Sequence, residues 1–183
     1  QHPLMLGGGF GRRGPSASNF VHQATKIAMQ VEGPVKLLWS REEDVQHDYY
    51  RPATASHMSA TLDENGQPTA WVNRYIRKDE PGEASQIPYA IANQSIRYVE
   101  SPVHVPYGAW RSVAHTQHTF FNESFIDELA HAAGKDPFDY RMGLIADKPR
   151  HTAVLAKAGK EAGWGTPLPE GRVRGVALQQ SFD

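Results

Sequence analysis

The chain has 183 residues, 39% hydrophobic and 21% charged, which is typical of a globular protein with one domain or a pair of small ones. Its 19 lysines and arginines nearly balance its 20 aspartates and glutamates, so no global field attracts nucleic acid or a membrane. The absence of cysteine excludes disulfides, thiolate metal sites, iron–sulfur ligation and a cysteine nucleophile within the chain.

No apolar run approaches the roughly 20 residues that span a bilayer, and no signal peptide is visible. The sequence opens on QHPLML, without a start methionine, and stops on LQQSFD inside a predicted strand. We therefore expect it to be a piece of a longer protein.

The first notable feature is GGGFGRRG, residues 7–14, with five glycines among eight residues. Glycine is costly to order, so this cluster is typical of backbone that adopts positive φ or lets another molecule approach its amides. A predicted helix follows directly. Its N-terminal N–H groups, together with Arg12 and Arg13, indicate an anion site of the kind that binds phosphate. The alternative is a tight turn with two solvated arginines.

Hydrophobic periodicity and turn residues predict the elements in chain order. They are a helix over 15–33 that starts near Pro15, Ser16 or Ser18, a strand over 35–39, a polar connection over 40–52, a hairpin over 57–76 that turns at Asn65-Gly66, a loop over 77–85, an irregular stretch with brief strands over 86–110, helices over about 116–133, 137–145 and 151–162, and a strand over 172–182. Helices mixed with an antiparallel hairpin predict an α+β fold, in which a mixed sheet packs against three to four helices.

The glycine stretch also matches G-x-G-x-x-G at residues 9–14, which allows a Rossmann-type dinucleotide-binding domain as an alternative. Three features count against it. The acids that follow the predicted strand, Glu42 and Glu43, lie nearer 30 than 20 residues after the glycines. Pro15 directly follows the third glycine, and a hairpin stands where a second parallel unit is expected.

A second candidate anion clamp is Arg111, in an aromatic and glycine-containing loop before the helix over 116–133. A planar, permanently charged guanidinium suits a phosphate or a carboxylate. The alternative is that Arg111 pairs with Glu123 or Asp127 and ties the loop down.

Three other clusters are weaker signals. His115 and His118, with Glu123, match no metal-ligand spacing, so we expect no metal site there. His47-Asp48 could form an acid–base pair, but a surface loop is the favoured interpretation. The run Arg41-Glu42-Glu43-Asp44 is typical of a solvated helix turn.

These motifs, taken in order, resemble the molybdopterin-binding large subunit of the xanthine dehydrogenase and aldehyde oxidase family. The sequence looks closest to the branch of isoquinoline 1-oxidoreductase beta subunits and membrane-bound aldehyde dehydrogenases. The family's G-G-G-F-G stands at residues 7–11, its strand and Arg-x-Glu-Asp turn at 35–44, and its second signature, R-G-F-G-x-P-Q, at 111–117. The downstream pattern also fits, at Glu123, Asp127-Glu128-Leu129-Ala130, Asp136-Pro137 and Arg141.

The resemblance covers essentially residues 1–183, which it implies are a fragment of the molybdopterin-binding region with a sub-boundary near 77–86. It implies molybdopterin as cofactor, in the cytosine dinucleotide form, in the full-length protein. The residues implied to bind it are Gly8, Gly9, Phe10, Gly11, Arg111 and Gln117. The amides of Phe10 and Gly11 would face an oxo ligand of the metal, and Arg111 would lie against the phosphate side of the pterin, with Gln117 as a polar support.

The implied activity is oxidation of an aldehyde or an N-heterocycle, with water as the oxygen source. The implied partners are the remainder of the large subunit and a small [2Fe–2S] subunit that takes the electrons, and a cytochrome c subunit is also allowed. No nucleic-acid partner is expected. Relatives in this branch are often periplasmic or membrane-associated, while a cytoplasmic location stays open.

Two departures from the family pattern matter. Ser112, Val113 and Ala114 replace Gly-Phe-Gly, so the aromatic that packs against a ring substrate in relatives is missing at Val113. No match to the C-terminal Gly-Glu motif that supplies the catalytic glutamate is found either, so we expect no catalytic residue in this chain. Alone, it should bind no cofactor tightly and turn nothing over. A structural or anion-binding module without catalysis is the alternative function.

Overall fold

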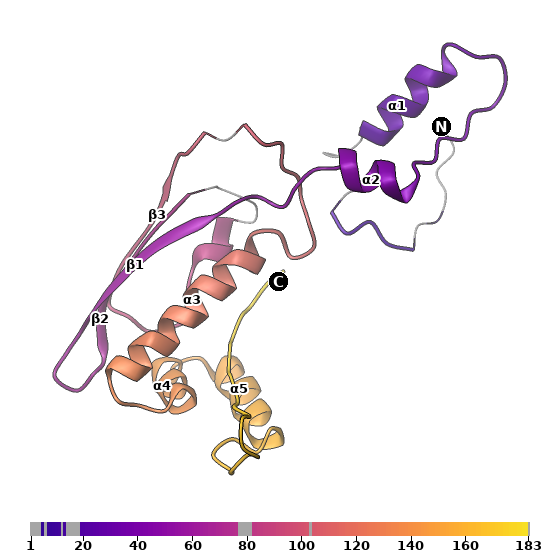
Figure 1. The fold of residues 1–183 in the computed structure, drawn as a ribbon. Helices are drawn as coiled ribbons and strands as arrows, with labels where there is room; N and C mark the ends of the chain where they lie inside the picture. The colour runs from indigo at the N-terminus through magenta and orange to yellow at the C-terminus, as the bar shows by residue number, and fades with distance from the viewer. Residues whose placement is uncertain are drawn as a thin grey trace. The chain divides into compact units, whose positions relative to one another are not determined.

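A computed structural model of the chain describes residue 5, residues 7–11, residue 13, and residues 19–76, 82–102 and 104–182. The chain divides into two compact units: unit 1 contains residues 1–53 and 102–113, and unit 2 contains residues 54–101 and 114–183. Figure 1 follows the elements along the chain. None of the helices in the described ranges has the length and hydropathy that a bilayer crossing requires.

Unit 1 contains two short helices, α1 (Asn19–Ala28) and α2 (Arg41–His47). The predicted first helix is confirmed over 19–28, whereas the predicted remainder, 29–33, forms turns and bends. Its predicted start at Pro15, Ser16 or Ser18 lies outside the described residues. Ser40 caps α2, because its hydroxyl accepts a hydrogen bond from the Glu43 amide at 3.2 Å. The predicted helix turn at 41–44 is therefore confirmed, as the acidic first turn of α2.

The strand predicted over 35–39 is wrong for this structure, since these residues belong to no helix or strand. The apolar alternation is present, but a strand also needs a neighbour for its N–H and C=O groups. No described segment of the chain supplies that neighbour.

Unit 2 is built on a three-stranded sheet of β1 (Ala55–Leu62), β2 (Pro68–Ile76) and β3 (Asn93–Val99), in the order β1-β2-β3. β1 and β2 are antiparallel and form the predicted hairpin, whereas β3 runs parallel to β2. The Asp63 carboxylate accepts hydrogen bonds from the amides of Asn65 and Gln67, and Gly66 takes a φ of 71°, as the Asn-Gly pair predicts.

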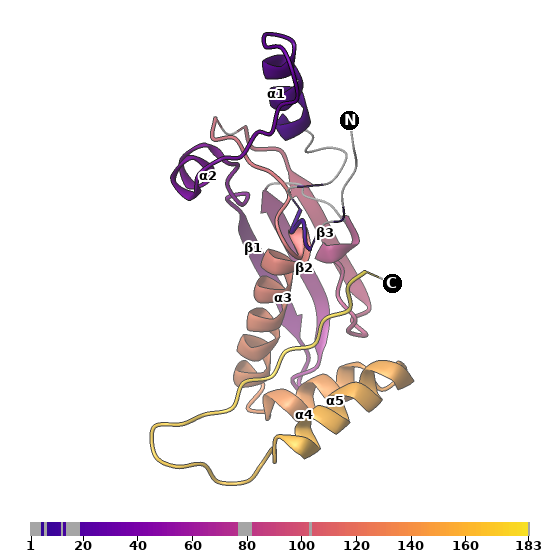
Figure 2. The ribbon, with the colours of Figure 1, turned by 90° about the vertical axis from the view of Figure 1, so that its right-hand side faces the viewer.

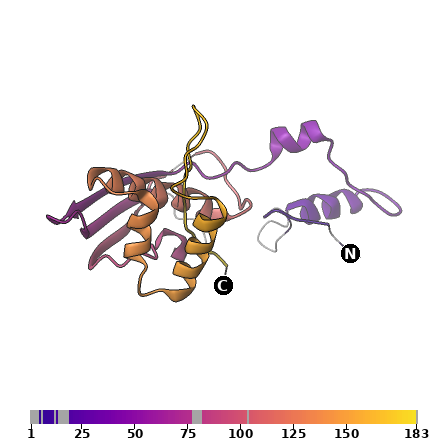
Figure 3. The same ribbon diagram turned by 90° about the horizontal axis from the view of Figure 1, so that it is seen from below.

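One 3₁₀ turn and three helices accompany the sheet: η2 (Gly82–Ser85), α3 (Val113–Ala132), α4 (Pro137–Leu144) and α5 (Pro149–Glu161). Figure 2 shows α3 along the sheet and α4 and α5 near the end of the sheet where the hairpin turns. In Figure 3 these helices lie on one side of the sheet. The α+β prediction, a mixed sheet with a hairpin and helices, is confirmed.

A continuous hydrophobic core joins the sheet of unit 2 to its helices. Trp71 on β2 is fully buried and contacts Phe125 on α3 edge to face, with ring centroids 5.1 Å apart. The other buried apolar members of the core are Tyr89, Ile91, Ile126, Leu129, Ala130, Tyr140, Leu144, Ile145, Leu155 and Leu178. This core stabilises unit 2 by removing large apolar side chains from water.

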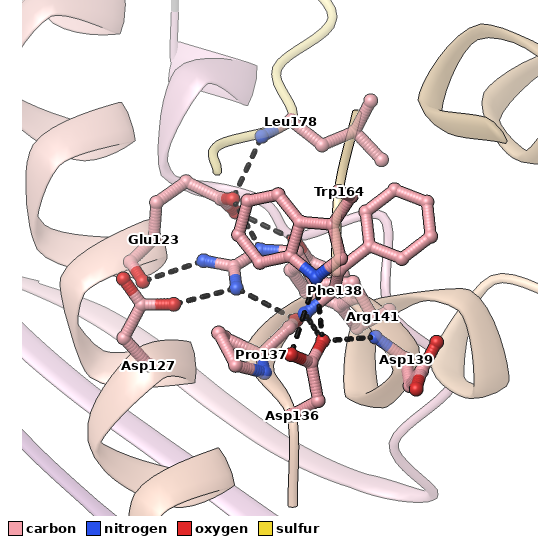
Figure 4. Close-up of polar contacts among 10 residues, drawn as sticks. Glu123, Asp127, Asp136, Pro137, Phe138, Asp139, Arg141, Trp164 and Leu178 are labelled. Carbon is pink, nitrogen blue, oxygen red and sulfur yellow. Dashed lines mark hydrogen bonds and ion pairs between the residues drawn. The ribbon is translucent and has the colours of Figure 1, made fainter. Parts of the chain in front are cut away.

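A buried ion-pair network ties α4 to α3 (Figure 4). Arg141 is fully buried and donates from Nε to Glu123 Oε2 at 2.9 Å and from Nη1 to Asp127 Oδ1 at 2.6 Å. Glu123 also accepts hydrogen bonds from the Tyr89 hydroxyl at 2.7 Å and from the Leu178 amide at 2.7 Å. Burial, and then the Glu123 charge, raise the pKa of Tyr89 well above its ordinary value.

The strand predicted over 172–182 is also wrong, because the described part of this segment pairs with no strand. Polar side chains hold it against the helices instead. Arg174 donates to the carbonyl oxygens of Ala162 and Thr166, and the Leu178 amide donates to the buried Glu123 carboxylate. The last of these bonds satisfies a main-chain group of the segment that a sheet would otherwise pair.

Candidate functional site

The glycine stretch forms a turn in which bare backbone is exposed. Phe10 and Gly11 both have positive φ, 46° and 91°, and the Phe10 side chain is 67% exposed. The Phe10 ring lies over Gly8, where an added Cβ would come within 3.0 Å of the ring. Within the described residues, the main-chain N–H groups of 7–11 donate no hydrogen bond. The turn therefore presents open donors, as the sequence predicts.

Gly11 contacts the loop that precedes Arg111. A Cβ at Gly11 would lie 2.5 Å from the Ala109 carbonyl oxygen and 3.1 Å from the Trp110 nitrogen. Only glycine allows this approach together with the positive φ. The structure thus brings together the two anion clamps that the sequence predicts nearly 100 residues apart.

A third segment, 49–51, fixes the position of this loop. The Tyr50 amide donates to Pro106 O at 3.3 Å, and the Gly108 amide donates to Tyr50 O at 3.0 Å, so the two segments form a short parallel bridge. The Trp110 indole N–H donates to Tyr49 O at 3.0 Å. Such a hydrogen bond from a side chain to the backbone fixes the loop in place.

Arg51 completes the cluster. Its Nη2 donates to the main-chain carbonyl of Arg111 at 3.1 Å, so one guanidinium holds the backbone of the other arginine. Sequence reasoning missed Arg51, which stands in the stretch interpreted as a polar connection. An arginine between paired tyrosines and a proline carries no local signal of a contact 60 residues away.

Arg13 packs against Gly9 in the turn and against Phe20 on α1. The stem of Arg13 lies over Gly9, and its guanidinium lies 4.8 Å from the centre of the Phe20 ring on α1, a cation–π contact. Arg13 therefore packs the turn against the helix as well as adding charge. Arg12, predicted as the other half of the anion site, lies outside the described residues.

The loop then enters α3 through strained backbone. Ser112 and Val113 have positive φ, 68° and 36°, where a non-glycine residue typically costs about 1 kcal/mol or more. The Val113 amide donates to Trp110 O at 2.8 Å, which closes the turn. Strain of this kind persists where packing of the surrounding structure, or contact with a ligand, fixes the main chain in that conformation.

The alternative pairing of Arg111 with Glu123 or Asp127 would join unit 1 to unit 2 and stays a prediction. Both Glu123 and Asp127 are bound by Arg141 within unit 2, and Glu123 is 5% exposed. The side chain of Arg111 is exposed to solvent.

Gln117, also predicted at the site, lies on α3 in unit 2 and is 9% exposed. Its Nε2 is buried and has no hydrogen-bond partner among the described residues, as is also true of His115 Nε2 and His118 Nδ1. A buried donor left unpaired costs about 1–3 kcal/mol. All three atoms belong to side chains of the first half of α3.

The histidines that the structure describes do not gather into a set of metal ligands. No group of three or more potential ligands comes together in the described part of the chain. His118 is buried, and burial first, then the nearby charge of His115, lower its pKa to about 4. His47 pairs with Glu43 on exposed α2, at 3.2 Å, so the surface interpretation of His47-Asp48 is supported.

Comparison with known proteins shows which family the chain resembles. The sequence profile of the molybdopterin cofactor-binding domain family matches residues 2–143. The chain is 27% identical to the isoquinoline 1-oxidoreductase subunit beta of Brevundimonas diminuta, over 89% of this chain and 23% of that protein. It is 30% identical to the aldehyde oxidoreductase molybdenum-binding subunit PaoC of Escherichia coli K12, over 75% of this chain and 20% of that protein.

A solved structure shares the fold. The crystal structure of quinoline 2-oxidoreductase from Pseudomonas putida 86 superposes with a TM-score of 0.68, covering 86% of this chain and 24% of that chain at 19% identity. This likeness overturns the Rossmann alternative, since the common fold is α+β and the segment after α1 forms no parallel strand. The chain spans about a quarter of the length of these relatives.

The profile match over residues 2–143 defines the class of protein. The chain belongs to the molybdopterin cofactor-binding domain family, found in the large subunits of xanthine dehydrogenase and aldehyde oxidoreductase enzymes.

Proposed function

We infer that this chain supplies the part of a molybdenum hydroxylase large subunit that holds the molybdenum end of molybdopterin, in an enzyme that oxidises an aldehyde or an N-heterocycle. The contact between Gly11 and Ala109 carries the proposal, because it places a turn of unpaired amides beside the loop of Arg111. Main-chain N–H groups together with a guanidinium suit oxyanions and phosphate. The residues present therefore fit the group that the family is named for.

When bound, the cofactor supplies the metal and redox chemistry, with water as the oxygen source and the cytosine dinucleotide as its form. The amides of Phe10 and Gly11 would donate hydrogen bonds to oxygen acceptors of the cofactor, and Gly8 and Gly9 keep the turn free of side chains. The exposed Phe10 ring would shape a wall of the site and exclude water. Arg111 would neutralise negative charge on the cofactor, held in place through its carbonyl by Arg51.

Val113 bears on the substrate. It stands where the family signature has an aromatic residue, so the site lacks one ring against which a heterocycle would stack. We propose that aldehydes are preferred over N-heterocycles. Electrons would pass to a separate [2Fe–2S] subunit, or onward to a cytochrome c subunit, because this chain has no cysteine to hold a cluster.

Two glycines of unit 1 provide the test. Gly11 and Gly33 have similar positive φ, 91° and 99°, but a Cβ at Gly33 meets nothing within 4 Å. In the full-length large subunit, Gly11→Ala should lose most of its molybdenum and pterin, while Gly33→Ala should keep both near the wild-type content. Arg111→Ala, with the exposed Arg97→Ala as its control, should also lose cofactor. Equal cofactor content in all four variants would overturn the proposal and favour a module without a cofactor role.

A further inference from the structure

A row of basic side chains crosses the sheet of unit 2. His57 on β1 is the register partner of Arg74 on β2, and Arg74 is the register partner of Arg97 on β3. Directly opposite residues of paired strands point to the same face, with Cβ atoms about 5 Å apart. All three side chains are exposed. The structure therefore places three basic groups side by side on one face of the sheet.

This face lies opposite the hydrophobic core. Asn73 and Tyr75, on either side of Arg74 in β2, are buried, whereas Arg74 is exposed. Successive side chains of a strand point to opposite faces, so Arg74 points away from the core. In Figure 3 the helices of unit 2 lie on one side of the sheet. The row thus lies on the side that these helices do not cover.

No acidic residue shares this face of β1, β2 and β3. The other register partners on it carry alanine, serine, threonine, asparagine, valine or isoleucine. Neither Arg74 nor Arg97 forms an ion pair or a hydrogen bond with any residue that the structure describes. Like charges directly opposite each other destabilise a sheet. In a chain with 19 basic and 20 acidic residues, this face is therefore a local excess of positive charge that an external anion would neutralise.

Apolar side chains flank the row. Val72 and Ile76, two positions before and after Arg74 on β2, are half-buried, and Val99 on β3 is 46% exposed. Arginine is enriched at protein–protein interfaces, where it pairs with carboxylates beside apolar contacts. Small ligands bind in concave sites that enclose them, and nucleic acid binds positive charge spread along its backbone. A short row of exposed cations among apolar side chains fits an acidic protein surface better than either.

We propose that this face of unit 2 docks a separate polypeptide, which presents Asp or Glu carboxylates to Arg74 and Arg97 and apolar side chains to Val72 and Ile76. Each guanidinium would form a charge-assisted pair with a carboxylate, which offsets the repulsion between the neighbouring cations. A second copy of the chain that docked symmetrically would bring the same cations to the interface, so charge favours a different partner. The proposal does not depend on the cofactor role.

Photo-cross-linking in the full-length large subunit tests what docks on this face. Ser59→p-benzoylphenylalanine places the cross-linker at an exposed position of β1 whose register partner is Val72, next to the row. Irradiation of intact cells should join it to another polypeptide, at a segment that contains Asp or Glu, as mass spectrometry identifies. Val154→p-benzoylphenylalanine, on exposed α5, should not reach that segment. Cross-links only within the large subunit, to a second copy of it, or to no protein would overturn the proposal.

Two matched pairs of substitutions test the role of the charge. Arg74→Gln with Arg97→Gln should lower the yield of that cross-link at least about tenfold, because two charge-assisted pairs are lost. Arg150→Gln with Arg172→Gln removes the same charge from exposed positions elsewhere in unit 2 and should change the yield less than about twofold. An unchanged yield, or equal losses in the two pairs, would overturn the proposal. Far-UV circular dichroism confirms that both variants are folded.

Binding of model anions to this chain separates the remaining occupants. Poly-L-glutamate should bind, and Arg74→Gln with Arg97→Gln should weaken its binding at least about tenfold. Tighter binding of inorganic phosphate or of a DNA duplex through the same two arginines would assign the face to a free oxyanion or to nucleic acid and overturn the proposal. Cofactor content is measured separately, and Arg97→Ala is expected to keep it, so the docking face and the cofactor role can fail independently.

Discussion

The two units of the chain differ sharply in how they bury their apolar residues. Unit 2 has a core that extends from Trp71 on the sheet to Leu155 on α5, with a fully buried arginine beside it. Among the described residues of unit 1, Pro52 alone is buried. Buried area is the main favourable term in folding, so unit 2 has much more of this stabilisation than unit 1 has in its described residues. The candidate cofactor residues of the turn and the Arg111 loop lie in unit 1.

The largest expected effect on this difference between the units comes from disrupting the ion pairs of unit 2. Arg141→Met leaves Glu123 buried without its cation, which should lower the free energy of unfolding of the chain by about 3–5 kcal/mol. Arg150→Met, an exposed arginine on α5, should change it by no more than about 0.5 kcal/mol. Urea unfolding followed by far-UV circular dichroism measures both. A loss at Arg141 as small as that at Arg150 would mean that the network does not stabilise unit 2.

The second-largest effect is expected from acid, which should lower the free energy of unfolding of unit 2. The pKa of His118 is about 4 in the folded chain, against an ordinary value of 6.5. At pH values between these two, the unfolded state therefore binds a proton that the folded state does not bind. Its contribution is complete above pH 6.5 and declines as the pH falls toward 4, by about 2–3 kcal/mol in all. His118→Gln should make the free energy of unfolding less dependent on pH between 4 and 6.5, whereas His131→Gln, at an exposed position of the same helix, should not. Identical pH profiles for the two variants would contradict the assignment.

The hairpin turn gives a smaller effect. A Cβ at Gly66 would lie 2.6 Å from the Cβ of Ala133, while a Cβ at Gly134, which also has positive φ, meets nothing within 4 Å. Gly66→Ala should destabilise unit 2 by about 2 kcal/mol and Gly134→Ala by about 1 kcal/mol, both from thermal unfolding. Adding Ala133→Gly should recover the difference. If it did not, the hairpin would not pack on α3 as the structure has it.

The smallest expected effect lies in unit 1. Leu38→Ser removes a side chain that is 82% exposed, so the unfolding free energy of this chain should change by less than about 0.5 kcal/mol. Differential scanning calorimetry of this chain measures it. A loss above about 1 kcal/mol would show that unit 1 buries Leu38 by itself, and the contrast between the units would fail.

Much of the fold could be predicted because its signals are local. The Asn65-Gly66 turn, the Asp136-Pro137 helix start and the apolar spacing of α3 each depend on residues a few positions apart. The strands predicted over 35–39 and 172–182 were wrong, because their patterns leave open whether a partner strand is present. The parallel pairing of β3 with β2 was missed for the same reason, since it joins residues about 23 positions apart.

The candidate site divides in the same way. The glycines and the arginine at 111 stand out in the sequence, because bare backbone and a permanent charge are unusual in such clusters. Arg51 does not stand out, and neither does Arg141 as the partner of Glu123, because each acts through a contact with residues far along the chain.

The sequence by itself therefore determined the chemistry of the turn, the helix and hairpin segments, and the family. Only the tertiary structure decided that Gly11 meets Ala109, that Arg51 holds the backbone of Arg111, and that unit 1 leaves its apolar residues uncovered. Local propensity is set by neighbours within a few residues, whereas contacts across the fold depend on how whole elements pack and on what surface remains for them to cover.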